Sequence, residues 1–177
     1  MNPVPAARHY SPIDRLVGSI DQALRTLLGG NSAARLPLRV REKEGLSYST
    51  YAFFSASSLD PTATFGVGAI FAPENKKRVE SAIQEELKRA LDAGFTESEF
   101  ENAKRGLLES RRIARAQDGS LLGRIANYAY LGRTFAWDID FEKRIQALTP
   151  AQVREALHRH IDPARLSVMK AGDFRLP

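Results

Sequence analysis

The sequence predicts an α+β fold in which helices pack on one face of an antiparallel sheet. Apolar residues recur at helical spacing over most of the chain, which indicates several amphipathic helices. Two adjacent strand-like runs, 47–57 and 62–71, are separated by a short turn and are expected to form an antiparallel hairpin. A third run, 166–171, is expected to be a closing strand. Helices combined with a largely antiparallel sheet in this order give a layered domain.

The composition bounds the class of protein. The 177 residues are enough for one domain with its own core, and 43% hydrophobic with 27% charged residues is typical of globular proteins. No apolar run approaches the length of a membrane-spanning helix, and no signal peptide is recognisable, so no membrane partner is expected. The absence of cysteine excludes disulfides, thiol catalysis and cysteine-bound zinc. Both the bacterial periplasm and the cytoplasm are compatible with this composition.

The net charge of +5 raises the question of nucleic-acid binding. The basic residues, however, are spread along the chain among 21 acidic ones. The densest basic run, 111–115, lies on a predicted helix, and we interpret it as a solvated helix face. No RNA-stacking signature or zinc-finger spacing is present, so no nucleic-acid partner is expected. A steep salt dependence of binding to DNA or RNA would be needed to revive that alternative.

Two helices are predicted before the hairpin. The first begins at Ser11, an N-cap followed by Pro12 at the first helical position, and stops at Gly29–Gly30. A shorter one is predicted for 33–43, with a bend or a late start at Pro37 because proline disrupts a helix interior.

The second strand of the hairpin has two unlike faces. Gly66 and Gly68 fall on one face, and the other carries only larger side chains, Phe65, Val67, Ala69 and Phe71. A strand face made of glycine implies that some other group packs closely against it.

Five further helices are predicted, two of which begin with capping boxes, at Thr96–Glu99 and Thr149–Gln152. Their expected ranges are 73–93, 97–117, 120–131, 135–148 (expected to be helical only in part) and 150–161. Neither a repeat nor a linker appears, so residues 11–177 are expected to form a single domain behind a loose N-terminal segment, residues 1–10. Because three strands are few for so many helices, we expect the sheet to lack its first strands.

The three histidines do not form a recognisable metal site. His9 lies in the N-terminal segment, and His158 and His160 are two residues apart on a predicted helix, so they point to different faces. No H-x-x-E-H or H-E-x-x-H motif, nucleophile elbow or P-loop is present. No metal or cofactor site is therefore expected in this chain.

Arg41 and Tyr48 are the candidate functional residues, and the residues alone allow two interpretations. In the first, Arg41 is a charged residue near a helix end and Tyr48 is a half-buried ring at the start of a strand. In the second, a guanidinium and a phenol on either side of a helix-to-strand turn face one cleft. Both groups are mainly hydrogen-bond donors, which suits a peptide carbonyl, a carboxylate or a developing oxyanion.

Several segments together resemble the C-terminal-half domain of the insulinase/pitrilysin-like zinc metallopeptidases. The resemblance covers residues 11 to 174, and the combination of REKEGLSY with an upstream Leu-Gly-Gly is specific where any single piece would be weak. The matching segments are 28–30, 41–48, 72–75, 94–99 and 166–174.

This resemblance implies a clamshell of two halves, fused or on separate subunits, each with helices packed on an antiparallel sheet. One half would bind zinc through H-x-x-E-H and a distal glutamate. The other would close over a peptide and contribute an arginine and a tyrosine, which are matched here by Arg41 and Tyr48. The tyrosine would donate to the oxyanion of the tetrahedral intermediate. The arginine would hold a substrate carbonyl or carboxylate and orient the tyrosine.

The chain departs from the family pattern because it lacks the zinc motif. The resemblance therefore implies the non-zinc half of a zinc endopeptidase, inactive alone, with a zinc-bearing half and a peptide substrate as partners. The chain also begins at the helix that normally follows the first strands of such a domain, which implies a fragment whose open strand edges favour self-association. A non-catalytic structural or substrate-recognition relative of the same family is the alternative.

Overall fold

The computed structural model of the chain describes residue 20, residues 22–59 and residues 62–173. A first helix, described at residues 20 and 22–28, precedes a π-helix, a β-hairpin, five α-helices and two short 3₁₀ turns. Their bounds are η1 Pro37–Lys43, β1 Ser49–Ala56, β2 Ala63–Ile70, η2 Pro73–Asn75, α2 Lys76–Ala93, α3 Glu97–Arg115, α4 Asp118–Tyr130, α5 Phe135–Ala147, α6 Pro150–His160 and η3 Pro163–Arg165.

The hairpin divides its side chains between a buried and an open face. β1 and β2 run antiparallel, with Ser49 opposite Ile70 at one end and Ala56 opposite Ala63 at the other. Ala52 of β1 is buried, and Phe65 and Val67 of β2 pack beside it against the main apolar core. That core joins the hairpin to the first helix, α2, the start of α3, and α6.

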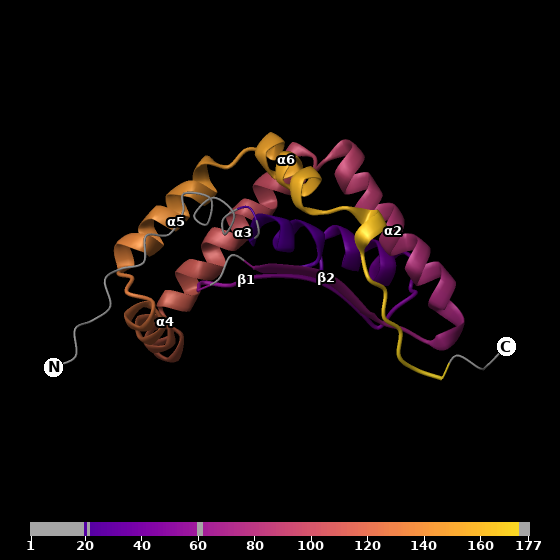
Figure 1. Cartoon of the computed structure of the whole chain (residues 1–177), viewed down its shortest axis with the longest axis horizontal. Coiled ribbons are helices and arrows are strands. Elements are labelled where there is room, and N and C mark those ends of the chain that lie inside the picture. Colours follow the sequence, from indigo (N-terminus) through magenta and orange to yellow (C-terminus); the bar gives the residue numbers. More distant parts are fainter. Residues whose placement is uncertain (1–19, 21, 60–61, 174–177) are drawn as a thin grey trace.

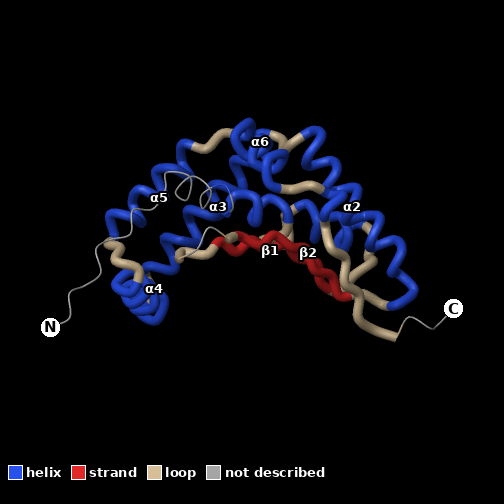
Figure 2. Tube along the Cα trace, viewed as in Figure 1, coloured by secondary structure: helices blue, strands red, loops and turns tan. Residues whose placement is uncertain are grey.

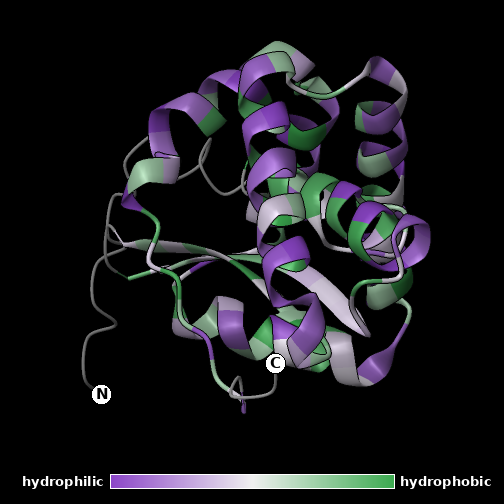
Figure 3. Ribbon diagram, turned by 90° about the vertical axis from the view of Figure 1, so that its right-hand side faces the viewer, coloured by the Kyte–Doolittle hydropathy of each residue, from purple (hydrophilic) through white to green (hydrophobic). Residues whose placement is uncertain are grey.

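The helices lie on one side of the hairpin and form an arch over it (Figure 1). α2 and α6 lie above it, α3 leads away from them, and α4 and α5 form the far end of the arch. In the same view, drawn by secondary structure, no described helix crosses below the two strands (Figure 2). The helices carry both hydrophilic and hydrophobic segments, as expected where one side of each is buried (Figure 3). The predicted α+β class with helices on one face is confirmed.

The first helix approaches β1 closely at Gly29. A Cβ atom at this position would lie 2.1 Å from the backbone nitrogen of Ala52 and 2.8 Å from its Cβ. No side chain fits there without moving the strand, so glycine sets how near the helix end can come to the sheet. Gly29 was predicted only to stop the helix, and the structure adds this close packing as a second reason for glycine.

Both predicted capping boxes are present. Thr96 caps α3 with Glu99 as its reciprocal partner, and Thr149 caps α6 with Gln152. Glu99 has a further role because its carboxylate accepts two hydrogen bonds from Arg35, at 2.7 Å and 2.8 Å. The Arg35 side chain is buried and also lies over the Phe95 ring, 4.5 Å from its centroid. This bidentate pair ties the chain before η1 to the first turn of α3.

α3, α4 and α5 are held together by ion pairs around one buried carboxylate. Asp138 on α5 is only 3% exposed and accepts hydrogen bonds from Arg111, Arg124 and Tyr128. Burial alone would raise the pKa of Asp138, but the hydrogen bond from Tyr128 and the arginine charges lower it. Burial and the same hydrogen bond raise the pKa of Tyr128 to about 12.

The interpretation of the basic run 111–115 as a solvated face is wrong for two of its arginines. Arg111 and Arg115 both pair with Asp138 and with Glu142 across the α3–α5 contact. These acids lie 23 to 31 residues away along the chain, so only the packing of the two helices could bring them to the arginines. Arg112 does face solvent and pairs with Glu109 on its own helix.

The predicted closing strand 166–171 is also wrong. Within the described chain, the sheet contains only β1 and β2, and residues 166–171 form no strand. A strand requires a hydrogen-bonding neighbour, and here the segment contacts α2 instead, where Lys170 Nζ lies 2.7 Å from a carboxylate oxygen of Glu80.

Three other expectations concern the N-terminal segment, the second predicted helix and membrane-spanning helices. Residues 1–10, the helix start at Ser11 and His9 lie outside the described residues. The helix predicted for 33–43 begins late, as Pro37 suggested, and continues as the π-helix η1. In the part of the chain that the structure describes, no helix has both the length and the apolar character needed to cross a membrane.

We predict that Gly29→Ala lowers the free energy of unfolding by about 2–3 kcal/mol, because the added methyl group must push β1 away from the first helix. Urea denaturation measures this loss. Gly106→Ala is the matched control, since nothing lies within 4 Å of a Cβ at Gly106 in the middle of α3. The control is expected to gain about 0.5–1 kcal/mol through helix propensity. Equal stabilities for the two variants would contradict the close approach.

We also predict that stability falls as the pH drops from about 5 towards 2. Hydrogen bonds from Arg35, together with those from Thr96, lower the pKa of Glu99 to about 2. A carboxyl with a depressed pKa in the folded state stabilises the fold above its ordinary pKa, and this contribution disappears on protonation. Because the side chain is 35% exposed, we expect only about 1–2 kcal/mol from it.

The measurement is urea denaturation of Glu99→Gln at a series of pH values. The variant should lose this stability at pH 7 and show a flatter dependence below pH 5. Glu97→Gln is the control, because Glu97 lies in the same helical turn but is exposed. A wild-type pH profile retained by Glu99→Gln would rule out this carboxyl as its source.

Candidate functional site

The candidate site is built on η1 and the turn that follows it. η1 is a π-helix, a rare conformation that occurs frequently at functional sites. Pro37 begins it, and Val40 is fully buried against Leu46, Val79 and Ala82 in a second apolar cluster. The buried side of the helix therefore packs on α2, and its other residues lie towards solvent.

Arg39 anchors this helix through three carboxylates. Its guanidinium contacts Glu44 at 2.8 Å and also pairs with Glu85 and Glu86 of α2. Glu86 is buried and is also bound by Arg89 at 2.8 Å. The hydrogen bond from Arg39 to Glu44, followed by that to Glu85, raises the pKa of the arginine, so it stays charged at any working pH. η1 is thereby fixed to α2 on its charged side as well as its apolar side.

The turn from η1 to β1 is fixed by backbone hydrogen bonds. Gly45 has φ +59°, a left-handed conformation that favours glycine, and its N–H donates to Arg41 O at 3.1 Å. The N–H of Leu46 donates to Val40 O at 2.8 Å, and Leu46 O accepts from the Asn75 side chain at 3.1 Å. The N–H of Tyr48 donates to Ile70 O at 2.8 Å, which joins the turn to the hairpin.

The two predicted site residues project from this fixed backbone into solvent. The Arg41 side chain is 54% exposed, and its nearest carboxylate, on Glu42, lies 3.6 Å away. Tyr48 is 83% exposed, although tyrosine rings are usually at least partly buried. Among the described residues, no hydrogen bond links the Tyr48 hydroxyl to another group, and none joins Arg41 to Tyr48. The expectation of a half-buried Tyr48 ring under the purely structural interpretation is wrong.

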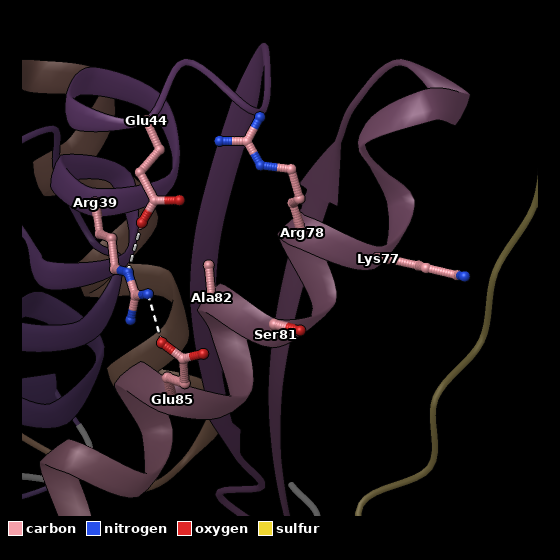
Figure 4. A pocket seen from close by; sticks show the side chains of 7 residues that line it. All are labelled: Arg39, Glu44, Lys77, Arg78, Ser81, Ala82 and Glu85. Carbon is pink, nitrogen blue, oxygen red and sulfur yellow. Dashed lines mark hydrogen bonds and ion pairs between the residues drawn. The ribbon is translucent and has the colours of Figure 1, made fainter.

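A cavity of about 250 Å³ lies beside the site, between η1 and α2. Figure 4 shows the Arg39 guanidinium between the carboxylates of Glu44 and Glu85 and in contact with both, while Lys77 points away from them. Arg78, Ser81 and Ala82 complete the lining. Neither Arg41 nor Tyr48 lines this cavity, so it is a charged hollow next to the candidate residues and does not contain them.

Two aromatic residues that the sequence analysis did not single out lie on β1 just after Tyr48. Tyr51 and Phe53 are on the open face of the hairpin, opposite Gly68 and Gly66 respectively. The glycine face of β2 was predicted to receive a closely packed group, and that group is this pair of rings. Pairing the two strands in register would have identified them.

The residues that the structure describes do not form a zinc site. In the part described by the structure, no cluster of three or more histidine, cysteine, aspartate or glutamate side chains is arranged to hold a metal ion. His158 and His160 lie at the exposed end of α6.

Comparison with known proteins identifies the family. Residues 20–107 match the family model described as the peptidase M16 inactive domain. The chain is 32% identical over 153 residues to an uncharacterized zinc protease of Streptomyces coelicolor, covering 86% of this chain and 32% of that protein. It is 26% identical over 137 residues to the non-peptidase homolog YmxG of Helicobacter pylori, covering 77% and 31%. The chain thus spans about a third of the length of these curated relatives.

A solved structure agrees with these matches. The peptidase M16 inactive domain from Pseudomonas fluorescens superposes with a TM-score of 0.73 at 25% identity, over 83% of this chain and 35% of that one. The resemblance that REKEGLSY and its neighbouring segments indicated is confirmed. The chain therefore belongs to the peptidase M16 family of zinc proteases, in which it is an inactive domain.

Proposed function

We propose that this chain is the non-zinc half of a zinc endopeptidase, closing over a peptide and supplying Arg41 and Tyr48 to the reaction. One observation carries the proposal. A rigid turn, fixed on both sides by hydrogen bonds and packing, holds Arg41 and Tyr48 out in solvent, where Arg41 makes only a 3.6 Å ion pair with the exposed Glu42 among the described residues. Exposing a tyrosine ring to this extent stabilises nothing within the domain.

The two side chains suit different parts of a peptide. The Tyr48 hydroxyl donates a hydrogen bond to the oxyanion that forms when the scissile carbonyl becomes tetrahedral. The guanidinium of Arg41 binds a neighbouring carbonyl or carboxylate and keeps the peptide in place. The other half of the enzyme would hold the zinc that activates water. A backbone fixed before substrate arrives avoids reorganisation during the reaction, which makes such donors effective.

The partners follow from this role. A zinc-bearing half, on the same polypeptide or on a separate subunit, closes against this domain with a peptide between them. The open edges of the hairpin would also accept a second copy of the chain where that half is missing.

A non-catalytic role within the same family is the second candidate, and one relative favours it. YmxG of Helicobacter pylori, which matches 77% of this chain, is named a non-peptidase homolog. In such a protein Arg41 and Tyr48 would bind a peptide without contributing to its cleavage. The two candidates differ in whether losing the phenol hydroxyl slows hydrolysis.

We predict that Tyr48→Phe in the full-length enzyme lowers kcat by roughly ten- to a thousandfold, the effect of losing one oxyanion donor. The ring remains, so folding and KM should change little. Cleavage of a fluorogenic peptide under steady-state conditions measures the effect. Tyr130→Phe, which removes a hydroxyl from another exposed tyrosine at the end of α4, is the control. Wild-type kcat in the Tyr48 variant would exclude the catalytic proposal and favour the non-catalytic one.

For Arg41→Ala we expect kcat/KM to fall by about ten- to a hundredfold, because a charged hydrogen bond to the peptide is lost. Much of this loss should appear in KM, since the arginine already binds the substrate before reaction. The control is Arg105→Ala, which removes an exposed arginine on α3. If both variants cleave the peptide like the wild type, Arg41 does not contact the substrate.

A further inference from the structure

The open face of the hairpin carries two large aromatic side chains. Tyr51 is 47% exposed and Phe53 is 40% exposed, and their ring centroids lie 6.5 Å apart at an interplanar angle of 35°. The helices of the arch lie on the opposite side of the strands, and no described helix crosses this face (Figure 1). The two rings together form one continuous apolar surface on a face that the domain does not cover.

The glycines of β2 hold these rings in place. A Cβ atom on Gly66 would lie 2.3 Å from Cζ of Phe53, and one on Gly68 would lie 2.4 Å from Cζ of Tyr51. Each ring therefore lies directly over the backbone of the facing strand, where a larger residue would displace it. This packing restricts the rings before any ligand arrives, which reduces the entropy lost on binding.

The charge of the surface indicates what it can bind. Between Leu46 and Ala72 the sequence contains one charged residue, Asp60. The remaining side chains of β1 on this face, Ser49 and Ser55, are small and uncharged. An apolar and uncharged segment loses little hydration on docking here, whereas a charged one would be desolvated without a partner.

The surface also lies close to the proposed site along the chain, because Tyr48 immediately precedes β1. At about 3.3 Å per residue, Tyr51 and Phe53 lie about 10 Å and about 17 Å along the strand from Tyr48. We consider an extended peptide that runs along β1 with its scissile bond at Tyr48. Its side chains about three and five residues from that bond would then lie over Tyr51 and Phe53.

We propose that Tyr51 and Phe53 form a peptide-binding surface that selects uncharged substrates with apolar side chains about three and five residues from the cleaved bond. This inference rests on the proposed function, since it takes the position of Tyr48 as the reference for the cleaved bond. It assigns to the hairpin a role in substrate selection, separate from the role of Tyr48 in the reaction itself. The alternative is a purely structural role, in which the rings only pack over the two glycines of β2.

The test is a binding measurement on the full-length protein with its zinc half, after chelation of zinc so that no peptide is cleaved. Two dye-labelled, blocked and uncharged peptides are compared by fluorescence anisotropy. They differ only in carrying phenylalanine or serine three and five residues from the central bond, on both sides. The wild type should bind the phenylalanine peptide more tightly. The double variant Tyr51→Thr/Phe53→Thr, which keeps residues suited to a strand, should lose about tenfold of that preference.

Two controls isolate the effect. Tyr51→Phe retains the ring and should retain the preference, and Tyr130→Ala, which removes an exposed tyrosine from α4, should leave both affinities unchanged. If the double variant does not fold, as judged by its thermal unfolding, the single variants Tyr51→Leu and Phe53→Leu replace it. Each should then lose about threefold of the preference.

An unchanged preference in a folded variant, or an equal loss of affinity for both peptides, overturns the inference. The outcome is separable from that of the proposed function. If Tyr48→Phe slows cleavage while the double variant binds like the wild type, only the aromatic surface is refuted. If the double variant loses the preference while Tyr48→Phe cleaves normally, the surface binds peptides and the oxyanion role fails.

Discussion

The molecule depends on the alternation of side chains along β1, which sends successive residues to opposite sides of the hairpin. On the helix side, Ala52 is small enough for the end of the first helix to approach at Gly29, and the main core forms around that contact. On the other side, Tyr51 and Phe53 are left in solvent. A shift of one residue in the strand would place these rings in the core and expose Ala52, so a single register determines both the packing and the open surface.

Charged groups reinforce this arrangement alongside the apolar contacts. Arg39 joins η1 to α2, Arg35 joins the preceding residues to α3, and Asp138 gathers arginines from α3 and α4 onto α5. Each of these contacts involves at least one side chain withdrawn from water, so the partner is needed to offset the cost of desolvation. Several of the arginines are thus used in contacts between elements of the domain.

The position of the candidate site fits a domain that assists a reaction centred elsewhere. The M16 family model that matches this chain describes an inactive domain, and the elements described here contain no metal-binding cluster. What the domain offers is a rigid turn with two exposed donors and, next to it, an uncharged aromatic surface.

The sequence by itself determined the local elements, the family and the two candidate residues. Capping boxes, the late start at Pro37 and the alternation in β2 follow from contacts within a few residues, and the structure agrees with them. Tertiary structure alone decided which residues far apart in the sequence contact one another and which side chains stay exposed. The pairing of Arg111 and Arg115 with acids on α5, the absence of a ladder at 166–171 among the described residues and the exposure of Tyr48 all depend on which elements lie side by side. Local sequence encodes the conformation of a segment, but the burial and charge partners of a side chain are set by neighbours that only the folded chain supplies.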